Sequence, residues 1–284
     1  MKLSVALRLG RVSNLPTVTS NVLAAVALSG GHPSQVQLVL VCVAMSLMYV
    51  AGMFLNDAFD REIDARERPE RPIPSGQVRA AQVFDAGFAM LFAGIALTAV
   101  VALLAGTGVR GPLCAVVLAA LIVGYDAYHK ENPASPIVMG LCRVGVYATA
   151  AFTVTRRVDS ALVGGMAALL CYLIGLTYIA RQENLSKVAN LWPLAVMAVP
   201  AWLAFPTEGS TLAWISYGAW IWMVGVALLM IIGRKIRDAV GLMIACIALL
   251  DATFAVNQGF PLLGLYAVVA HGLTRWLQRT IPGT

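Results

Sequence analysis

Long apolar stretches separated by short polar segments run through almost the whole chain. They lie near residues 15–31, 36–55, 82–105, 112–125, 136–155, 161–180, 188–205, 211–232, 238–256 and 260–274. Most of them approach the roughly 20 residues that an α-helix needs to cross the hydrocarbon core of a membrane, and the fourth and the last are shorter. This pattern predicts an all-α fold, a polytopic transmembrane helical bundle of nine or ten spans.

The composition favours a membrane protein with a single domain. The chain has 284 residues, of which 60% are hydrophobic and 12% are charged, whereas a soluble domain carries about 25% charged residues. No linker or low-complexity tract divides residues 1–284, which we expect to form one domain. The net charge of +6 is explained by basic loop residues and predicts no nucleic-acid partner.

The basic residues predict the orientation of the bundle, because Lys and Arg collect in cytoplasmic loops. With the N-terminus inside, the outer loops carry only Arg110, Arg156 and Arg157, and the long loop 57–80 is cytoplasmic. The first apolar stretch lacks a small-residue cleavage site, so we expect it to remain as a span. The prediction is a multi-pass protein of the membrane, the inner membrane in a bacterium, with a polar site that faces the cytoplasm.

Three polar clusters follow predicted spans at their cytoplasmic ends. They lie near residues 56–80, 125–135 and 181–187. Since all three are expected on one side of the membrane, we predict that they enclose a single pocket.

The first cluster begins with an acidic run, Asn56, Asp57, Asp60 and Asp64. If the helix continues through this run, the Asp side chains have the spacing i, i+3, i+7 and share one face, over about 10 Å. Mg²⁺ takes oxygen ligands and usually binds through one or two carboxylates plus substrate phosphates. These residues are therefore candidate ligands for Mg²⁺ and a diphosphate. The alternative is a solvated helix end whose acids pair with neighbouring arginines.

A proline-rich loop follows the acidic run. Pro69, Pro72 and Pro74 have fixed φ and no backbone N–H, so they break the helix and stiffen the chain. Arg68 and Arg71 are presented from this restrained segment. Because the planar guanidinium can bind phosphate oxygens in pairs, both are candidate substrate-binding residues.

These two segments together resemble the UbiA superfamily of membrane prenyltransferases. The run Asn56-Asp57-Ala-Phe-Asp60-Arg-Glu-Ile-Asp64 matches its N-D-x-x-D-x-x-x-D signature, and Arg71-Pro-Ile-Pro-Ser-Gly76 matches the loop that follows. The resemblance implies a helical transmembrane bundle that binds an isoprenoid diphosphate donor through Mg²⁺. It also implies that the prenyl group is transferred to an acceptor that is often aromatic, and that the three aspartates take part in catalysis.

The second polar cluster matches the family less closely. Many relatives carry a Tyr-x-x-x-Lys element here, but from Tyr125 the lysine comes one residue late, at Lys130, and His129 takes the expected place. Lys130 is a candidate catalytic residue as a phosphate contact, or a basic anchor at the membrane surface. Tyr125 is a candidate substrate contact or an interfacial aromatic, and His129 is expected to be a solvated loop residue.

The third cluster departs further from the resemblance. Where the family normally has a second Asp-rich motif, this chain carries Arg181, Glu183, Asn184 and Lys187. Glu183 is a candidate metal ligand, and Arg181 and Lys187 are candidate phosphate contacts that replace part of the missing metal charge. Whether a second metal site exists stays open.

Two ionisable residues fall inside predicted spans, Arg143 in the fifth and Asp251 in the ninth. Ionisable groups within the membrane are costly and usually face a partner or a polar cavity. Arg143 is therefore interpreted either as a structural pairing residue or as a substrate contact. Asp251, with Asn257, is expected to end the ninth span near the outer interface.

The function predicted from these residues is intramembrane, Mg²⁺-assisted prenyl transfer from an isoprenoid diphosphate to an acceptor expected to be aromatic. Two alternatives remain: transfer to a non-aromatic lipid or sugar, and a carrier that binds a prenylated lipid without catalysis. A transporter is disfavoured because transporter charges gather near the membrane midplane rather than in loops. The expected partners are the donor, an unknown acceptor and membrane lipid.

Overall fold

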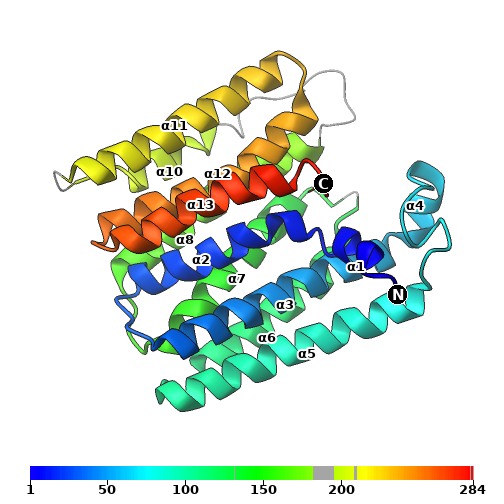
Figure 1. Cartoon of the computed structure of the whole chain (residues 1–284), viewed down its shortest axis with the longest axis horizontal. Helices are drawn as coiled ribbons and strands as arrows, with labels where there is room; N and C mark the ends of the chain where they lie inside the picture. The colour runs from blue at the N-terminus through cyan, green and yellow to red at the C-terminus, as the bar shows by residue number, and fades with distance from the viewer. Residues whose placement is uncertain (131, 182–194, 208–209, 282, 284) are drawn as a thin grey trace.

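The computed structural model describes residues 1–284 except 131, 182–194, 208–209, 282 and 284 (Figure 1). Its regular structure in the described residues is helical throughout, which confirms the predicted all-α fold. The elements are α1 (Leu3–Leu9), η1 (Val12–Asn14), α2 (Leu15–Leu28), α3 (Gln35–Phe59), α4 (Arg61–Glu67), α5 (Ala80–Ala105), α6 (Arg110–Tyr128), α7 (Ser135–Val154), α8 (Ser160–Arg181), α10 (Ala198–Leu203), α11 (Thr211–Ile232), α12 (Ile236–Asn257) and α13 (Pro261–Leu277).

Most of the long helices are suited to a membrane. Seven of the described helices are long and apolar enough to cross it, namely α3, α5, α6, α7, α8, α11 and α12. The helix α2 and the 17-residue α13 are shorter and pack beside them. In the stretch expected near 188–205, the described part holds the short helix α10, and residues 188–194 lie outside the described residues. The count of nine or ten spans stays a prediction.

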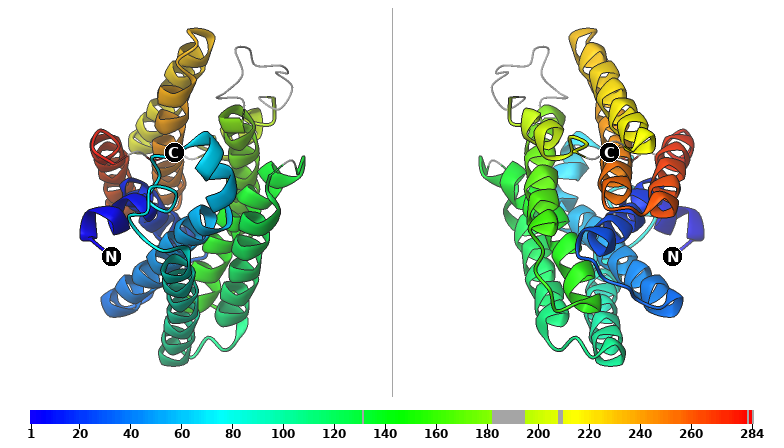
Figure 2. Two further views of the ribbon diagram at one scale, coloured as in Figure 1. Left: turned by 90° about the vertical axis from the view of Figure 1, so that its right-hand side faces the viewer. Right: turned by 90° about the vertical axis from the view of Figure 1, so that its left-hand side faces the viewer.

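The helix α12 lies at the centre of the bundle. Its most apolar window is 89% buried, whereas the windows of the other spans are at most 56% buried. It packs against α2, α8, α11 and α13. The two views in Figure 2, turned by 90° from Figure 1, place α5 and α6 on one side of the bundle and α11 and α13 on another. Asp251 on α12 is 1% exposed, so this carboxyl group is held inside the protein rather than in lipid. The expectation that Asp251 ends its span is wrong, because α12 continues past it to Asn257.

Close packing of α5 fixes the position of α3, the helix that leads into the acidic run. A Cβ atom built on Gly94 would lie 2.5 Å from the Cγ of Met48 and 3.1 Å from the carbonyl oxygen of Ala44. Real Cβ atoms essentially never come within 3.0 Å of another atom, so a side chain at this position of α5 would displace Met48 and crowd the backbone of α3. Ser34 and Gln37 form a capping box at the start of α3 and fix its other end.

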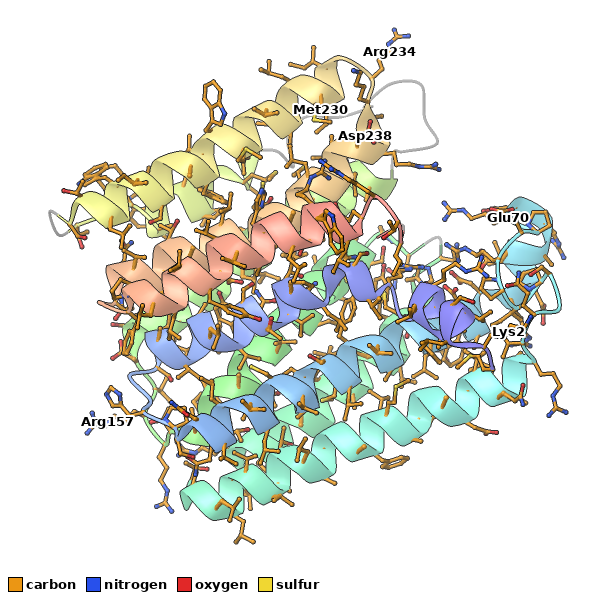
Figure 3. The ribbon with its side chains drawn as sticks, in the orientation of Figure 1. Lys2, Glu70, Arg157, Met230, Arg234 and Asp238 are labelled. Carbon is orange, nitrogen blue, oxygen red and sulfur yellow. The ribbon has the colours of Figure 1, made fainter. Side chains whose placement is uncertain are left out.

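The polar clusters gather at one end of the bundle. In Figure 1 the N-terminus, the C-terminus and α4 lie at the same end, and the Nδ2 of Asn14 donates a hydrogen bond of 2.9 Å to the carbonyl oxygen of Gly283. Figure 3 shows Arg157 at the opposite end from Lys2 and Glu70. The cytoplasmic placement of the polar end stays a prediction.

Candidate active site

The acidic run continues helically past the end of α3, as the spacing argument requires. The backbone N–H of Asp60 donates to the carbonyl oxygen of Asn56 at 2.9 Å, and that of Asp64 donates to Asp60 at 2.8 Å. All four predicted side chains are buried, with residue exposures of 8% or less for Asn56, Asp57, Asp60 and Asp64. The run therefore faces the protein interior and not open solvent.

Arg71 joins two of these carboxylates. Its Nη1 donates to the Oδ2 of Asp64 at 2.7 Å and to the Oδ1 of Asp57 at 3.4 Å. Burial alone would lower the pKa of Arg71, but the neighbouring carboxylates outweigh it and raise the pKa above its ordinary value. The arginine therefore carries its full charge in the site.

The proline-rich loop holds Arg71 through its backbone. The N–H of Arg71 donates to Arg68 and the N–H of Ser75 donates to Arg71, both at 3.0 Å, and Gly76 closes the turn with φ 74°. A positive φ is adopted far more easily by glycine than by other residues. Arg68, the other predicted loop contact, lines the cavity described below.

Arg11 is a second cation in the site that the sequence analysis did not identify. Its Nη2 donates to the Oδ1 of Asp57 at 3.2 Å and to the Oδ1 of Asn56 at 3.3 Å. Arg11 immediately precedes the short helix η1 and lies 45 residues from Asn56 in sequence. No local pattern links the two, so only the fold brings them together.

Asp60 is held by the second polar cluster. The Nε2 of His129 and the Nζ of Lys130 each lie 3.5 Å from its Oδ2. Burial would raise the pKa of Asp60, but the hydrogen bonds and charges of these two residues outweigh it and hold the pKa below its usual value. The acids of the run thus pair with Arg11, Arg71, His129 and Lys130, and Arg61 pairs with Glu62 instead.

The prediction that His129 is a solvated loop residue is wrong. Its side chain is 14% exposed, and its ring stacks on Tyr125 with the centroids 4.8 Å apart. The signal for this contact was the spacing of four residues between Tyr125 and His129, which places both on one helical face. The Nδ1 of His129 also lies 3.2 Å from the carbonyl oxygen of Tyr125.

Asp126 is a further carboxylate that the sequence analysis missed. It is 5% exposed, and the Nδ2 of Asn56 donates to its Oδ1 at 3.3 Å. Its Oδ2 is buried without a hydrogen-bond partner in the described part of the protein. A carboxylate in the last turn of an apolar helix was the available signal, because such a group is costly unless it serves a polar site.

A cavity of about 400 Å³ opens from this polar cluster into the bundle. Its polar lining includes Arg11, Asn56, Asp60, Asp64, Arg68, Arg71, Tyr125, Asp126, His129 and Lys130. Its apolar lining includes Met48, Leu118, Ile122, Leu173, Leu176, Ile244 and Ile247. One compartment thus combines charged groups suited to a diphosphate with a surface suited to a hydrocarbon chain. Arg143 also lines this cavity.

The third polar cluster falls largely outside the described residues. Glu183 and Lys187 lie in the segment that is not described, and Arg181 ends α8 with its side chain outside the description. Their predicted roles, and the question of a second metal site, stay predictions.

The residues present fit Mg²⁺ in their chemistry. Asn56, the three aspartates of the run and the unpartnered oxygen of Asp126 supply the hard oxygen donors that Mg²⁺ prefers. Among the described residues, no three His, Cys, Asp or Glu side chains are gathered closely enough to hold an ion by themselves. The carboxylates contact cationic side chains instead, so an ion would have to share them with those cations.

Comparison with known proteins now decides the family. The model of the UbiA prenyltransferase family matches residues 16–233, which is most of the chain. The chain belongs to the UbiA prenyltransferase family. This confirms the resemblance drawn from the acidic run and the proline-rich loop.

The individual UbiA relatives match shorter stretches. A digeranylgeranylglyceryl phosphate synthase from Korarchaeum cryptofilum is 40% identical over 62 residues, which are 22% of this chain and 22% of that protein. The similarity thus spans about a fifth of the relative's length.

Solved UbiA structures cover the chain more fully. A UbiA homolog from Aeropyrum pernix K1 superposes with a TM-score of 0.69 and 16% identity, covering 89% of this chain and 96% of that one. A UbiA homolog from Archaeoglobus fulgidus bound to GPP and Mg²⁺ superposes with a TM-score of 0.53 and 14% identity, covering 94% of this chain and 99% of that one. At these identities the likeness establishes the fold.

Proposed function

We propose that this UbiA-family protein transfers a prenyl group from an isoprenoid diphosphate to an acceptor within the membrane, with Mg²⁺ assisting the loss of diphosphate. The observation that carries this proposal is the cavity itself, in which buried carboxylates and cations adjoin an apolar wall. The bound GPP and Mg²⁺ of the Archaeoglobus fulgidus homolog support the choice of donor and ion.

The charges of the site suit the bond that must break. The allylic carbon–oxygen bond of the donor breaks with its electron pair going to the diphosphate, the acceptor atom bonds to the same carbon, and the acceptor loses a proton. Arg11, Arg71 and Lys130 are positioned to donate to diphosphate oxygens on which negative charge grows. Asn56, Asp57, Asp60 and Asp64 would hold Mg²⁺, which neutralises the departing diphosphate when bound.

The apolar wall has a separate role. It receives the hydrocarbon chain and keeps water from the allylic cation, which would otherwise be hydrolysed. The protein is integral to the membrane, and we infer that the site opens to the cytoplasmic side because the basic loops gather at that end.

The acceptor is less constrained than the donor. The aromatic acceptor expected from the sequence has no support among the relatives compared above, whereas the name of the Korarchaeum relative denotes a glyceryl phosphate lipid. We therefore favour the non-aromatic lipid alternative.

The proposal is tested by replacing one carboxylate of the site. Purified protein in lipid nanodiscs is supplied with geranylgeranyl diphosphate, Mg²⁺ and a membrane lipid extract, and released diphosphate is measured. Asp60→Asn is expected to lower the rate by at least about 100-fold, because an ion ligand and a paired buried charge are lost together. Asp85→Asn, on the exposed face of α5, is the matched control and should keep the parental rate. An unchanged rate in Asp60→Asn would reject catalysis through this site.

A further inference from the structure

Arg143 lines the inner part of the cavity, away from the charged residues of the acidic run. It belongs to α7, and its guanidinium lies over the ring of Tyr49 on α3, with 5.5 Å from Cζ to the ring centroid. Tyr49 precedes Asn56 by seven residues on the same helix, which corresponds to about 10 Å along its axis. The cavity therefore has two separate cationic regions, one at the acidic run and one about two helical turns further in.

The surroundings of Arg143 orient it without neutralising it directly. Its Nη1 donates to the Oδ1 of Asn21 at 2.7 Å and its Nη2 donates to the Oγ1 of Thr17 at 3.3 Å. No Asp or Glu of the described residues lies within ion-pair distance of it. A guanidinium has five N–H donors, and these two bonds use only two of them. The remaining N–H groups are available to a ligand in the cavity that Arg143 lines.

Asp251 completes this arrangement from the central helix α12. Its Oδ2 accepts from Ser20 at 2.5 Å and from the Nδ2 of Asn21 at 2.8 Å, and its Oδ1 accepts from the hydroxyl of Tyr147 at 2.5 Å. Asn21 thus stands between Asp251 and Arg143, donating to one and accepting from the other. Asp251 and Asn21 act as positioning residues that fix the direction of the guanidinium.

The carboxylate of Asp251 reaches Arg143 only through Asn21, so no anion contacts the guanidinium directly within the described residues. A buried cation with N–H groups left over is costly unless a ligand in the cavity accepts from them. The prenyl chain of the donor cannot be that partner, because it is a hydrocarbon. The diphosphate has its own cations at the acidic run. A molecule that must also enter this cavity is the acceptor.

We propose that Arg143 binds an anionic headgroup, a phosphate or carboxylate, of the acceptor, and so selects acidic acceptors over neutral ones. This inference rests on the proposed prenyl transfer. The separation of about 10 Å along α3 accommodates two reacting atoms about 3 Å apart together with a short spacer that carries the charged group. Arg143 holds the charged end while the acceptor's reacting atom faces the allylic carbon.

The test compares two acceptor probes that differ only in the phosphate group, geranylgeranylglyceryl phosphate and geranylgeranylglycerol. Binding of each radiolabelled probe is measured by equilibrium dialysis against protein in nanodiscs of neutral lipid. The parent protein is expected to bind the phosphorylated probe about 10- to 100-fold more tightly, the effect of hydrogen bonds to a charged group. Arg143→Gln should abolish this preference. Arg143→Lys keeps the charge but loses the planar guanidinium that can form two parallel hydrogen bonds, so it should retain part of the preference.

Two controls separate this inference from stability and from the proposed function. Arg157→Gln removes an exposed arginine at the opposite end of the bundle (Figure 3) and should keep the full preference. Mg²⁺-dependent binding of inorganic diphosphate reports the other cationic region and should be unchanged in Arg143→Gln, which also shows that the variant is folded. If that variant does not fold, the reduced preference of Arg143→Lys decides.

The outcomes are distinct. A preference for the phosphorylated probe that survives in Arg143→Gln, or its absence in the parent, overturns the inference even if prenyl transfer is observed. Absence of diphosphate release from any donor overturns the proposed function, whereas the binding comparison still decides the role of Arg143.

Discussion

Removing Arg71 should move the requirements for donor and for Mg²⁺ in opposite directions. Arg71 donates to the carboxylates of Asp57 and Asp64, the same groups that an ion would use. In Arg71→Ala the donor loses a phosphate contact, so a higher donor concentration is needed. The ion, however, no longer shares its carboxylates with a cation, so a lower Mg²⁺ concentration suffices.

The size of each effect follows from the contacts. The Arg71 side chain is 17% exposed, so solvent screens it only partly, and a hydrogen bond to a charged group contributes about 1.5–3 kcal/mol. A loss of that size raises the donor KM by about 10- to 100-fold. The competing pair with Asp64 is the shorter of the two, at 2.7 Å, and its removal should lower the half-saturating Mg²⁺ concentration by at least about threefold, the equivalent of about 0.7 kcal/mol.

The assay is diphosphate release from geranylgeranyl diphosphate, titrated separately with donor and with Mg²⁺. Arg66→Ala is the matched control, since Arg66 is an exposed arginine on α4 close to the same site. Arg71→Lys should fall between the parent and Arg71→Ala. Donor and Mg²⁺ curves that superpose on those of the parent, or a rise in both requirements, would refute the reasoning.

Two further predictions concern the other acids. Asp126→Asn keeps an acceptor for Asn56 but removes a buried carboxyl group with an unpartnered oxygen. The melting temperature should therefore be equal or higher, while the half-saturating Mg²⁺ concentration rises because an oxygen ligand is lost; a lower melting temperature with unchanged Mg²⁺ dependence would contradict this. The pKa of Asp60 is held below its usual value, so its stabilising contribution is present above an unfolded pKa of about 3.9 and is lost as the pH falls through the folded value. The difference in melting temperature between parent and Asp60→Asn should therefore shrink as the pH falls below about pH 4; a difference that instead grows there would show that the sign is wrong.

The sequence predicted the fold class and the core of the site because both depend on local patterns. Apolar stretches of membrane length predict helices directly, and the Asp57, Asp60 and Asp64 spacing places these carboxylates along one helical path. The proline-rich loop likewise predicted that Arg71 is presented from a restrained segment as a phosphate contact, whereas its bonds to Asp57 and Asp64 were not predicted. These predictions needed no knowledge of which helices are neighbours.

The remaining parts of the site depend on contacts between distant segments. Arg11 reaches Asn56 and Asp57 only because α1 packs against α3. His129 was misjudged because its partner, Asp60, lies on another helix. The relation of Arg143 to Asp251 runs through Asn21, on a third helix. Such relations are set by helix packing, which a single sequence does not specify.

The proposal that this protein catalyses prenyl transfer is most directly tested by measuring both products of the reaction. Radiolabelled geranylgeranyl diphosphate is incubated with the protein in nanodiscs, Mg²⁺ and a membrane lipid extract, and labelled lipid and released diphosphate are quantified together. Prenyl transfer predicts one diphosphate for each labelled lipid, and no product when Mg²⁺ is chelated. Donor that binds but is recovered intact with every acceptor pool would contradict catalysis and identify the protein as a carrier.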